Sequence, residues 1–150
     1  MKISSAAFKD GEMMPKKYTA DGENISPPLA IEGVPLKTES LILIMEDPDA
    51  QGGTFTHWLV WNISPEKTEI KEGGKTGFEG RNDFGRLGYG GPCPPSGIHK
   101  YVFRLHAMDG FMPITSGSKI DALKKAMTGH ILEQATLIGR YSREYNLAKQ

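Results

Sequence analysis

Two hydrogen-bonding side chains, His99 and Tyr101, follow a stiff loop that begins at Gly90. The loop carries prolines, which fix the backbone angle φ and remove N–H donors, and glycines, which allow close backbone approach. From His99 to Ala107 the residues alternate as in a β-strand, so side chains two positions apart share a face. His99 and Tyr101 are therefore predicted to point the same way, as a pair of donors at the mouth of a rigid loop.

An acidic turn and a second histidine lie earlier in the chain. The apolar run 41–45 is typical of a strand buried on both faces, and it leads into Asp47 in a turn-prone segment. In the strand predicted at Phe55–Ile63, the odd-numbered positions share one face, which places His57 among apolar side chains. Asp47 and His57 are thus expected to lie near each other.

Each of these residues also has an ordinary structural interpretation when it is considered alone. A single histidine on an apolar face is more often a hydrogen-bonded core residue than a ligand, and Asp47 is more often a turn residue. Tyr101 fits a buried aromatic residue whose hydroxyl is bonded locally. Cys93 has no base near it in the sequence, and we interpret it as a small hydrophobic residue.

Composition and charge limit the classes of function. A chain of 150 residues predicts one domain, over residues 1–150. Its 18 basic and 18 acidic residues leave no basic excess, which argues against binding to nucleic acid.

The single cysteine excludes an internal disulfide and favours a reducing compartment. No apolar signal segment follows the N-terminus, and no apolar run could span a bilayer, so we expect a cytoplasmic protein without stable membrane insertion.

The remaining pattern predicts several short strands and little helix. The longer strands are predicted at Ser40–Glu46, Phe55–Ile63 and Lys100–Met108. Residues 64–92 are predicted to form a long loop with one short strand. A helix is predicted to begin after Ser118, acting as its N-cap, and to end at Gly129. Residues 130–141 fit either a helix or a strand. Short strands separated by turn signals favour a β-sandwich.

Three separated motifs carry a family signal. They are Asp-Pro-Asp-Ala at 47–50, His-Trp-Leu-Val-Trp-Asn-Ile at 57–63 and Gly-Pro-Cys-Pro-Pro-Ser-Gly-Ile-His-Lys-Tyr at 91–101. In this order they closely resemble the phosphatidylethanolamine-binding protein family, in its bacterial and archaeal Raf-kinase-inhibitor-like branch. The segments 4–12, 17–29 and 80–92 also resemble that branch, so nearly the whole chain is covered. One departure is Gln51, which stands where the family usually has a proline.

The resemblance implies a mainly β fold, a two-sheet antiparallel Greek-key β-sandwich with a few short peripheral helices. It favours a strand for residues 130–141. It also implies a small anion pocket for phosphate or phosphoryl head groups such as phosphoethanolamine. The pocket residues would be Asp47, Phe55, His57, Gly91, Pro92, His99 and Tyr101. Gly91 would line the floor of this pocket and Phe55 its rim.

The chemistry of these residues suits a phosphoryl ligand. Phosphoryl oxygens bind several donors in a fixed geometry, and His57, His99 and Tyr101 can each donate. The carboxylate of Asp47 would repel an anion. It is expected instead to hydrogen-bond an imidazole, fix its tautomer and keep it cationic.

The leading hypothesis is a non-catalytic binding protein with no cofactor and no metal, because no nucleophile and base are arranged for turnover. Inhibition of a kinase or serine protease is a further expectation, with the pocket capturing a phosphorylated or acidic side chain of the partner. An alternative is a metal-dependent enzyme with Asp47, His57 and His99 as ligands, a set found at iron sites. The natural ligand, the partner and the oligomeric state stay open, a homodimer being one expectation.

Overall fold

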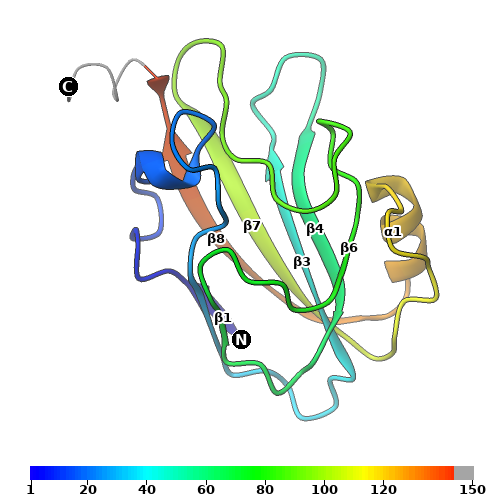
Figure 1. The fold of residues 1–150 in the computed structure, drawn as a ribbon. Helices are drawn as coiled ribbons and strands as arrows, with labels where there is room; N and C mark the ends of the chain where they lie inside the picture. The colour runs from blue at the N-terminus through cyan, green and yellow to red at the C-terminus, as the bar shows by residue number, and fades with distance from the viewer. Residues whose placement is uncertain (144–150) are drawn as a thin grey trace.

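The computed structural model describes residues 1–143, and its strands form two antiparallel β-sheets accompanied by one α-helix (Figure 1). The elements are β1 (Lys2–Ser4), η1 (Lys16–Tyr18, a 3-10 turn), β2 (Leu29–Glu32), β3 (Ser40–Asp47), β4 (Phe55–Ile63), β5 (Glu69–Ile70), β6 (Phe78–Glu79), β7 (His99–Met108), α1 (Ile120–Met127) and β8 (Ile131–Tyr141). The small sheet has the order β1-β2-β5 and the large sheet β6-β4-β3-β7-β8. The predicted fold class is confirmed.

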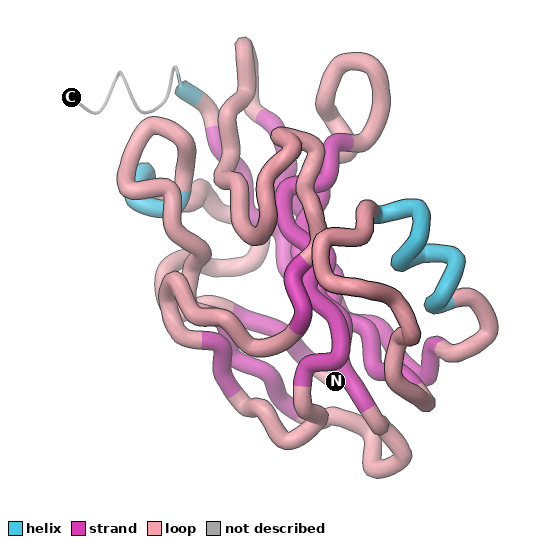
Figure 2. Tube along the Cα trace, turned by 45° about the vertical axis from the view of Figure 1, so that its right-hand side comes forward, coloured by secondary structure: helices cyan, strands magenta, loops and turns pink. Residues whose placement is uncertain are grey.

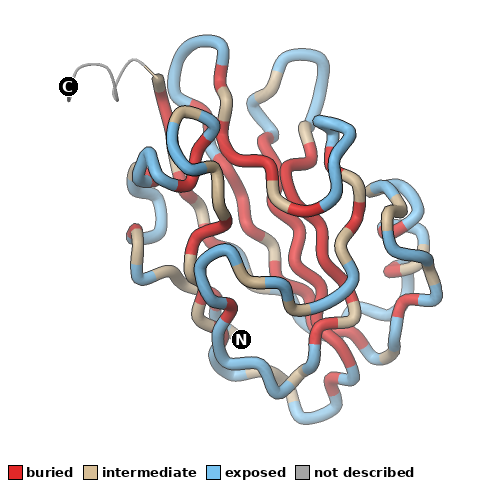
Figure 3. The backbone as a smooth tube through the Cα atoms, in the orientation of Figure 1, coloured by how far each residue is buried: buried red, intermediate tan, exposed pale blue. Residues whose placement is uncertain are grey.

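Strand β3 runs through the middle of the large sheet and is buried on both faces, as its apolar run predicts. On the inner face, Leu43 belongs to a core that includes Ile31 of the small sheet. On the outer face, Ile44 packs with Leu123 of α1. Figure 2 shows α1 beside the strands, and Figure 3 shows that the central strands are the most buried part of the chain. The large sheet is therefore the middle of three layers.

A β-bulge interrupts the pairing of β3 with β4. Met45 pairs with Trp58, but the next pair is Glu46 with Thr56, so His57 is an extra residue on β4. A bulge places one additional residue in one strand and changes the direction of the side chains around it. A second register shift lies between Leu41, which pairs with Ile63, and Leu43, which pairs with Val60, so β4 consists of three segments whose alternation is out of phase.

The bulge makes the strict alternation predicted for β4 wrong. His57 lies on the inner face, where its ring centroid is 5.2 Å from that of Tyr101. Leu59 and Trp61, which alternation would place beside His57, instead lie on the outer face in the core formed with α1. The histidine reaches the inner face because of the extra residue, while the strand beyond it keeps its apolar side chains packed on both sides.

The structure confirms the predicted C-terminal end of helix α1 but not its predicted N-cap. Helix α1 ends at Met127, and Gly129 with φ 83° follows it, as predicted. Its N-cap is Lys119 without a side-chain cap bond, whereas Ser118 donates its hydroxyl to the carbonyl of Thr115, so the predicted cap is wrong. Within residues 1–143, no helix has the length and apolar character needed to cross a membrane.

Strand β8 resolves the ambiguous segment. It pairs with β7 along almost its whole length, with His99 opposite Tyr141 at one end. The expectation of a strand at 130–141, which came from the family resemblance, is thereby confirmed.

The segment predicted as a loop with one short strand, residues 64–92, contains two short strands, β5 and β6. Its far end is fastened to β4, because the N–H of Gly90 donates to the carbonyl of His57 at 2.9 Å.

Candidate functional site

A cavity of about 220 Å³ lies at one end of the large sheet, between the loop that follows β3 and the loop that precedes β7. These loops stand at the top of Figure 1. The cavity is lined by Asp47, Ala50, Gln51, Phe55, His57, Phe84, Cys93, Pro94, Pro95, His99 and Tyr101. It brings together all of the predicted site residues except Gly91 and Pro92. Gln51, the departure from the family pattern, is part of its wall.

Asp47, the last residue of β3, holds the ring of His99. The Oδ2 atom of Asp47 lies 2.6 Å from Nδ1 of His99, and both side chains are buried. An ionised carboxylate only accepts hydrogen bonds, so Nδ1 of His99 is the donor. The Oδ1 atom of Asp47 accepts the N–H of Asp49 at 2.8 Å, and Asp49 in turn accepts the N–H of Lys100 at 2.9 Å. The acidic turn therefore positions the start of β7.

His57 is held by a backbone carbonyl instead. Its Nδ1 lies 2.6 Å from the carbonyl oxygen of Gly90. A carbonyl can only accept, so the proton of the neutral imidazole sits on Nδ1 and Nε2 carries the lone pair. The rings of Phe55, Phe84 and Tyr101 surround it, with centroids 4.9, 5.4 and 5.2 Å away. This aromatic shell keeps water from the ring.

Burial lowers the pKa of His57 below its usual range, although the Gly90 carbonyl and the Asp47 carboxylate act in the opposite direction. His57 is therefore neutral at pH 7. The expectation that Asp47 keeps a pocket imidazole cationic is wrong for His57, because desolvation outweighs the attraction of the carboxylate. Asp47 makes its direct bond to the other histidine.

Tyr101 contributes a hydroxyl that has no hydrogen-bond partner within residues 1–143. The side chain is fully buried, at 0% exposure, and it lines the cavity. Burial, followed by the nearby Asp47 carboxylate, raises the pKa of this hydroxyl above its usual range, so it stays protonated and able to donate. An unsatisfied buried polar group costs about 1–3 kcal/mol. A polar partner bound in the cavity would remove that cost.

Gly91 and Pro92 lie outside the cavity wall, which corrects the prediction that Gly91 forms its floor. The N–H of Gly91 donates to Oδ1 of Asn24 at 2.8 Å, and a Cβ at Gly91 would lie 2.5 Å from that oxygen and from the carbonyl oxygen of Tyr18. The carbonyl of Pro92 accepts the N–H of Ala20 at 3.0 Å. Both residues fasten the loop to the η1 region, and the glycine is needed because the two backbones touch.

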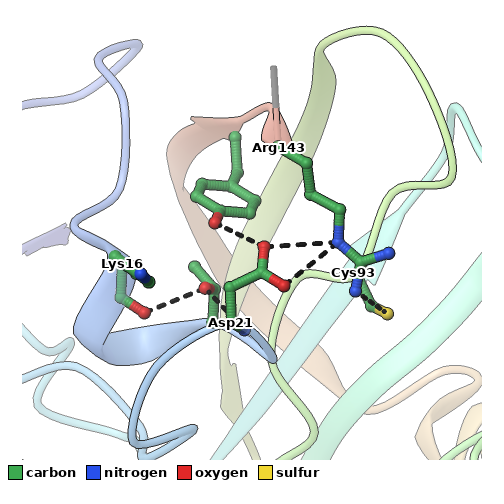
Figure 4. A network of polar contacts seen from close by, with 6 residues as sticks. Lys16, Asp21, Cys93 and Arg143 are labelled. Atoms are coloured by element: carbon green, nitrogen blue, oxygen red, sulfur yellow. Dashed lines mark hydrogen bonds and ion pairs between the residues drawn. The ribbon is translucent and has the colours of Figure 1, made fainter. Parts of the chain in front are cut away.

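Cys93 faces the cavity and also belongs to a polar network (Figure 4). Arg143 donates from Nη2 to its sulfur at 3.0 Å, and Nε of Arg143 lies 3.2 Å from both carboxylate oxygens of Asp21. Tyr141 donates its hydroxyl to Asp21 at 2.7 Å. The sequence interpretation of Cys93 as a small hydrophobic residue misses this contact, because nothing in the local pattern links it to Arg143. The network ties the proline-rich loop to the end of β8.

Larger grooves lie elsewhere on the surface, and some of their charged side chains already have partners. One groove, of about 420 Å³, includes Glu79, which accepts a hydrogen bond from Trp58 at 3.2 Å. Another, of about 480 Å³, includes Glu46 with Arg104 at 3.0 Å and Lys124 at 3.5 Å. The smaller cavity differs in that two histidines, an aspartate and a tyrosine, all buried, converge on it, which is typical of functional sites.

The alternative metal site finds no support in the side-chain arrangement. Among residues 1–143, no group of three or more His, Cys, Asp or Glu side chains is placed to hold a metal ion. Both oxygens of Asp47 already accept hydrogen bonds, and Nδ1 of each pocket histidine is bonded to a protein oxygen. The set Asp47, His57 and His99 is therefore arranged as two separate hydrogen-bonded units.

The fold and the cavity define a two-sheet β protein with a small pocket, lined by both titratable and apolar side chains, at the end of its large sheet. The family model described as phosphatidylethanolamine-binding protein matches residues 4–142. The chain belongs to the phosphatidylethanolamine-binding protein family.

Relatives with known sequences cover nearly the full length of the chain. A UPF0098 protein of Methanothermobacter thermautotrophicus is 46% identical over 150 residues, covering 95% of this chain and 99% of the relative. The crystal structure of a phosphatidylethanolamine-binding protein homolog, CT736 of Chlamydia trachomatis, has a TM-score of 0.90 and 39% identity, covering 94% of this chain and 96% of that one. That of YbcL from E. coli has a TM-score of 0.87 and 30% identity, covering 94% and 97%.

Proposed function

We propose that this protein is a non-catalytic binding protein that holds small phosphorylated anions in the cavity between Asp47, His57, His99 and Tyr101. The observation that supports this most is the buried hydroxyl of Tyr101, which has no partner within residues 1–143. Its neighbour His99, bonded through Nδ1 to Asp47, has Nε2 left to donate when the ring is protonated. Two donors that converge from β7 suit the oxygens of one phosphoryl group.

The size and charge of the cavity favour a head-group-sized ligand. Its volume of about 220 Å³ is below the roughly 300–1,000 Å³ of pockets for drug-sized molecules. No lysine or arginine is among its lining residues. Affinity would therefore come from directed hydrogen bonds rather than from a cationic cluster. Phosphate, phosphoethanolamine and similar monoesters fit these limits.

A non-catalytic role is supported by how the reactive side chains are engaged. The sulfur of Cys93, the only thiol in the chain, accepts a hydrogen bond from Arg143, and the imidazole of His99 donates from Nδ1 to the Asp47 carboxylate. Nucleophilic catalysis needs a nucleophile within hydrogen-bond reach of its base. We therefore expect ligands to leave the cavity unchanged.

Calorimetry with phosphoethanolamine, phosphate and acetate tests this proposal. Phosphoryl ligands should bind at millimolar concentration or below, and acetate more weakly. Cys93 offers an independent report of the location, because it is the only cysteine in the chain and lines the cavity. Bound phosphoethanolamine should slow its alkylation by iodoacetamide, and acetate at equal ionic strength should not. Binding of none of the three, or binding that leaves the alkylation rate unchanged, contradicts the proposal.

A second candidate is capture of a phosphorylated or acidic side chain on a kinase or serine protease. The observation that favours it is Ile98, an apolar residue 55% exposed directly before His99. An exposed apolar side chain beside a polar cavity suits contact with a protein surface. A pull-down of such a partner that free phosphoethanolamine fails to compete away would rule out capture through this cavity.

A further inference from the structure

The two histidines of the cavity differ in what they offer a ligand, and this difference decides which protonation state of a phosphoryl group fits. The Nδ1 atom of His99 faces the Asp47 carboxylate at 2.6 Å, so a protonated His99 would be paired with a negative charge. The Nδ1 atom of His57 faces a neutral carbonyl, that of Gly90, also at 2.6 Å. Only His99 has a partner that compensates a positive charge.

His57 is therefore an acceptor in the cavity. His57 is 3% exposed, its ring is enclosed by aromatic neighbours, and burial lowers its pKa. With the ring proton on Nδ1, the lone pair of Nε2 is the remaining polar function of the side chain. A phosphoryl group with no hydrogen would set a negatively charged oxygen against this lone pair. One with a P–OH group would donate to it.

We propose that His57 accepts a hydrogen bond from the ligand, and that the cavity thereby selects phosphate monoesters carrying one proton. In this arrangement Tyr101 and protonated His99 donate to the charged oxygens, and Nε2 of His57 receives the P–OH hydrogen. This inference rests on the proposed function and goes beyond it, because it names the ionic form that binds. It also gives a role to a neutral, buried histidine in a site for anions.

The charged groups around His57 come from three elements. Asp47 approaches from the end of β3, Asp83 from the loop before Gly90, and His99 stands on β7 beside Tyr101. The carboxylate of Asp83 is occupied by the N–H of Thr56 at 2.7 Å. Titration of any of these groups would change the affinity for every anion alike. A comparison between two ligands of equal charge cancels that common effect.

Methyl phosphate and methyl sulfate provide such a comparison. At pH 5 both are monoanions of similar shape, but only methyl phosphate has a hydrogen to donate, since phosphate monoesters lose their second proton near pH ~6. Methyl phosphate should bind on the order of tenfold more tightly at pH 5. Above pH ~6 this advantage should fall by up to about tenfold per pH unit, because the protonated fraction falls at that rate.

His57→Asn is the decisive variant. The asparagine amide can still donate to the carbonyl of Gly90, whereas the acceptor at the position of Nε2 is lost. The preference for methyl phosphate at pH 5 should disappear. His106→Asn is the matched control, because His106 is another buried histidine but lies on the outer face, away from the cavity, and its removal should leave the preference intact.

A measurement on the unmodified protein covers the case in which His57→Asn does not fold. At pH 8, calorimetry in buffers of different ionisation enthalpy should show about one more proton taken up with methyl phosphate than with methyl sulfate. Equal affinity for the two ligands at pH 5, or equal proton uptake at pH 8, overturns this inference alone. Binding of neither ligand at any pH overturns the proposed function together with it.

Discussion

The carboxylate of Asp47 and the imidazole of His99 form a buried pair, with Oδ2 and Nδ1 2.6 Å apart. The two residues end one strand and begin another, so the bond also joins β3 to β7 at the edge of the cavity. It leaves only Nε2 of His99 to meet a ligand. The direction in which that nitrogen acts depends on where the ring proton lies, and Asp47 places the proton on Nδ1.

Replacement of Asp47 with Asn should reverse the tautomer of neutral His99. The N–H of Asp49 would keep the amide oxygen on its own side, so the amide nitrogen would face Nδ1 and donate to it, and the ring proton would move to Nε2. Long-range ¹H–¹⁵N NMR spectra distinguish the two tautomers, and His57 serves as an internal control because its Nδ1 remains bonded to Gly90. The variant should also be less stable by about 1.5–3 kcal/mol, from loss of a charge-assisted bond. A His99 signal that still reports Nδ1–H would contradict the assignment.

Tyr101→Phe should separate binding from stability. The hydroxyl has no partner within residues 1–143, so its removal should leave the free energy of unfolding unchanged or raise it by up to about 1 kcal/mol, while phosphate affinity falls about tenfold. Tyr141→Phe is the matched control. Its hydroxyl donates to Asp21 at 2.7 Å, so that variant should lose about 1–2 kcal/mol and retain its affinity. The reverse pattern in urea denaturation and calorimetry would exclude Tyr101 as a ligand donor.

His106 should make the protein acid-sensitive. Burial, with help from Arg104, lowers its pKa from 6.5 to about 4. Between pH 6.5 and about pH 4, His106 is therefore protonated in the unfolded chain but neutral in the folded chain. Stability is therefore lost as the pH falls through this window, by up to about 1.4 kcal/mol per pH unit.

The measurement is urea denaturation of wild type and His106→Gln from pH 7 to pH 4. The variant should lose less stability over this range. The dependence of its free energy of unfolding on pH that remains includes the contribution of His57, whose pKa is also lowered by burial. Parallel curves for the two proteins would show that His106 is protonated without cost in the folded state.

Gly91→Ala should disturb the proline-rich loop. The new methyl group would meet Oδ1 of Asn24 and the carbonyl of Tyr18 at 2.5 Å, and backbone atoms cannot move aside easily. We expect a loss of about 1–3 kcal/mol from overpacking. Gly110→Ala provides the control, since no atom lies within 4 Å of the corresponding position, and it should change stability by less than about 0.5 kcal/mol. Equal effects in thermal denaturation would refute this view of the loop.

Much of the fold follows from short-range patterns. The apolar run at 41–45 predicts a strand buried on both faces, and β3 is that strand. Helix α1 ends where Gly129 predicts it. The grouping of Asp47 and His57 with His99 and Tyr101 follows from motif resemblance, and two-residue alternation adds that His99 and Tyr101 share a face. These features depend on neighbours in the chain or on patterns that relatives share.

The features that sequence reasoning missed depend on contacts between distant segments. The roles of Gly91 and Pro92 are set by the η1 loop, which packs against them from the other side of the cavity wall. The partner of Cys93 is Arg143, far along the chain. The neutrality of His57 results from its aromatic enclosure rather than from its distance to Asp47. Burial and long-range pairing have no local signature that a single sequence displays.

The bulge at His57 has a genetic consequence. Without His57, Thr56 would precede Trp58 directly, and the register on both sides of the gap would match regular antiparallel pairing, because Glu46 already opposes Thr56 and Met45 opposes Trp58. Loss of a single codon would therefore remove this histidine and leave the phase of every other β4 side chain unchanged. Most deletions inside a central strand exchange its two faces. At this position the gene can gain or lose one side chain of the cavity as an insertion or a deletion, independently of the core.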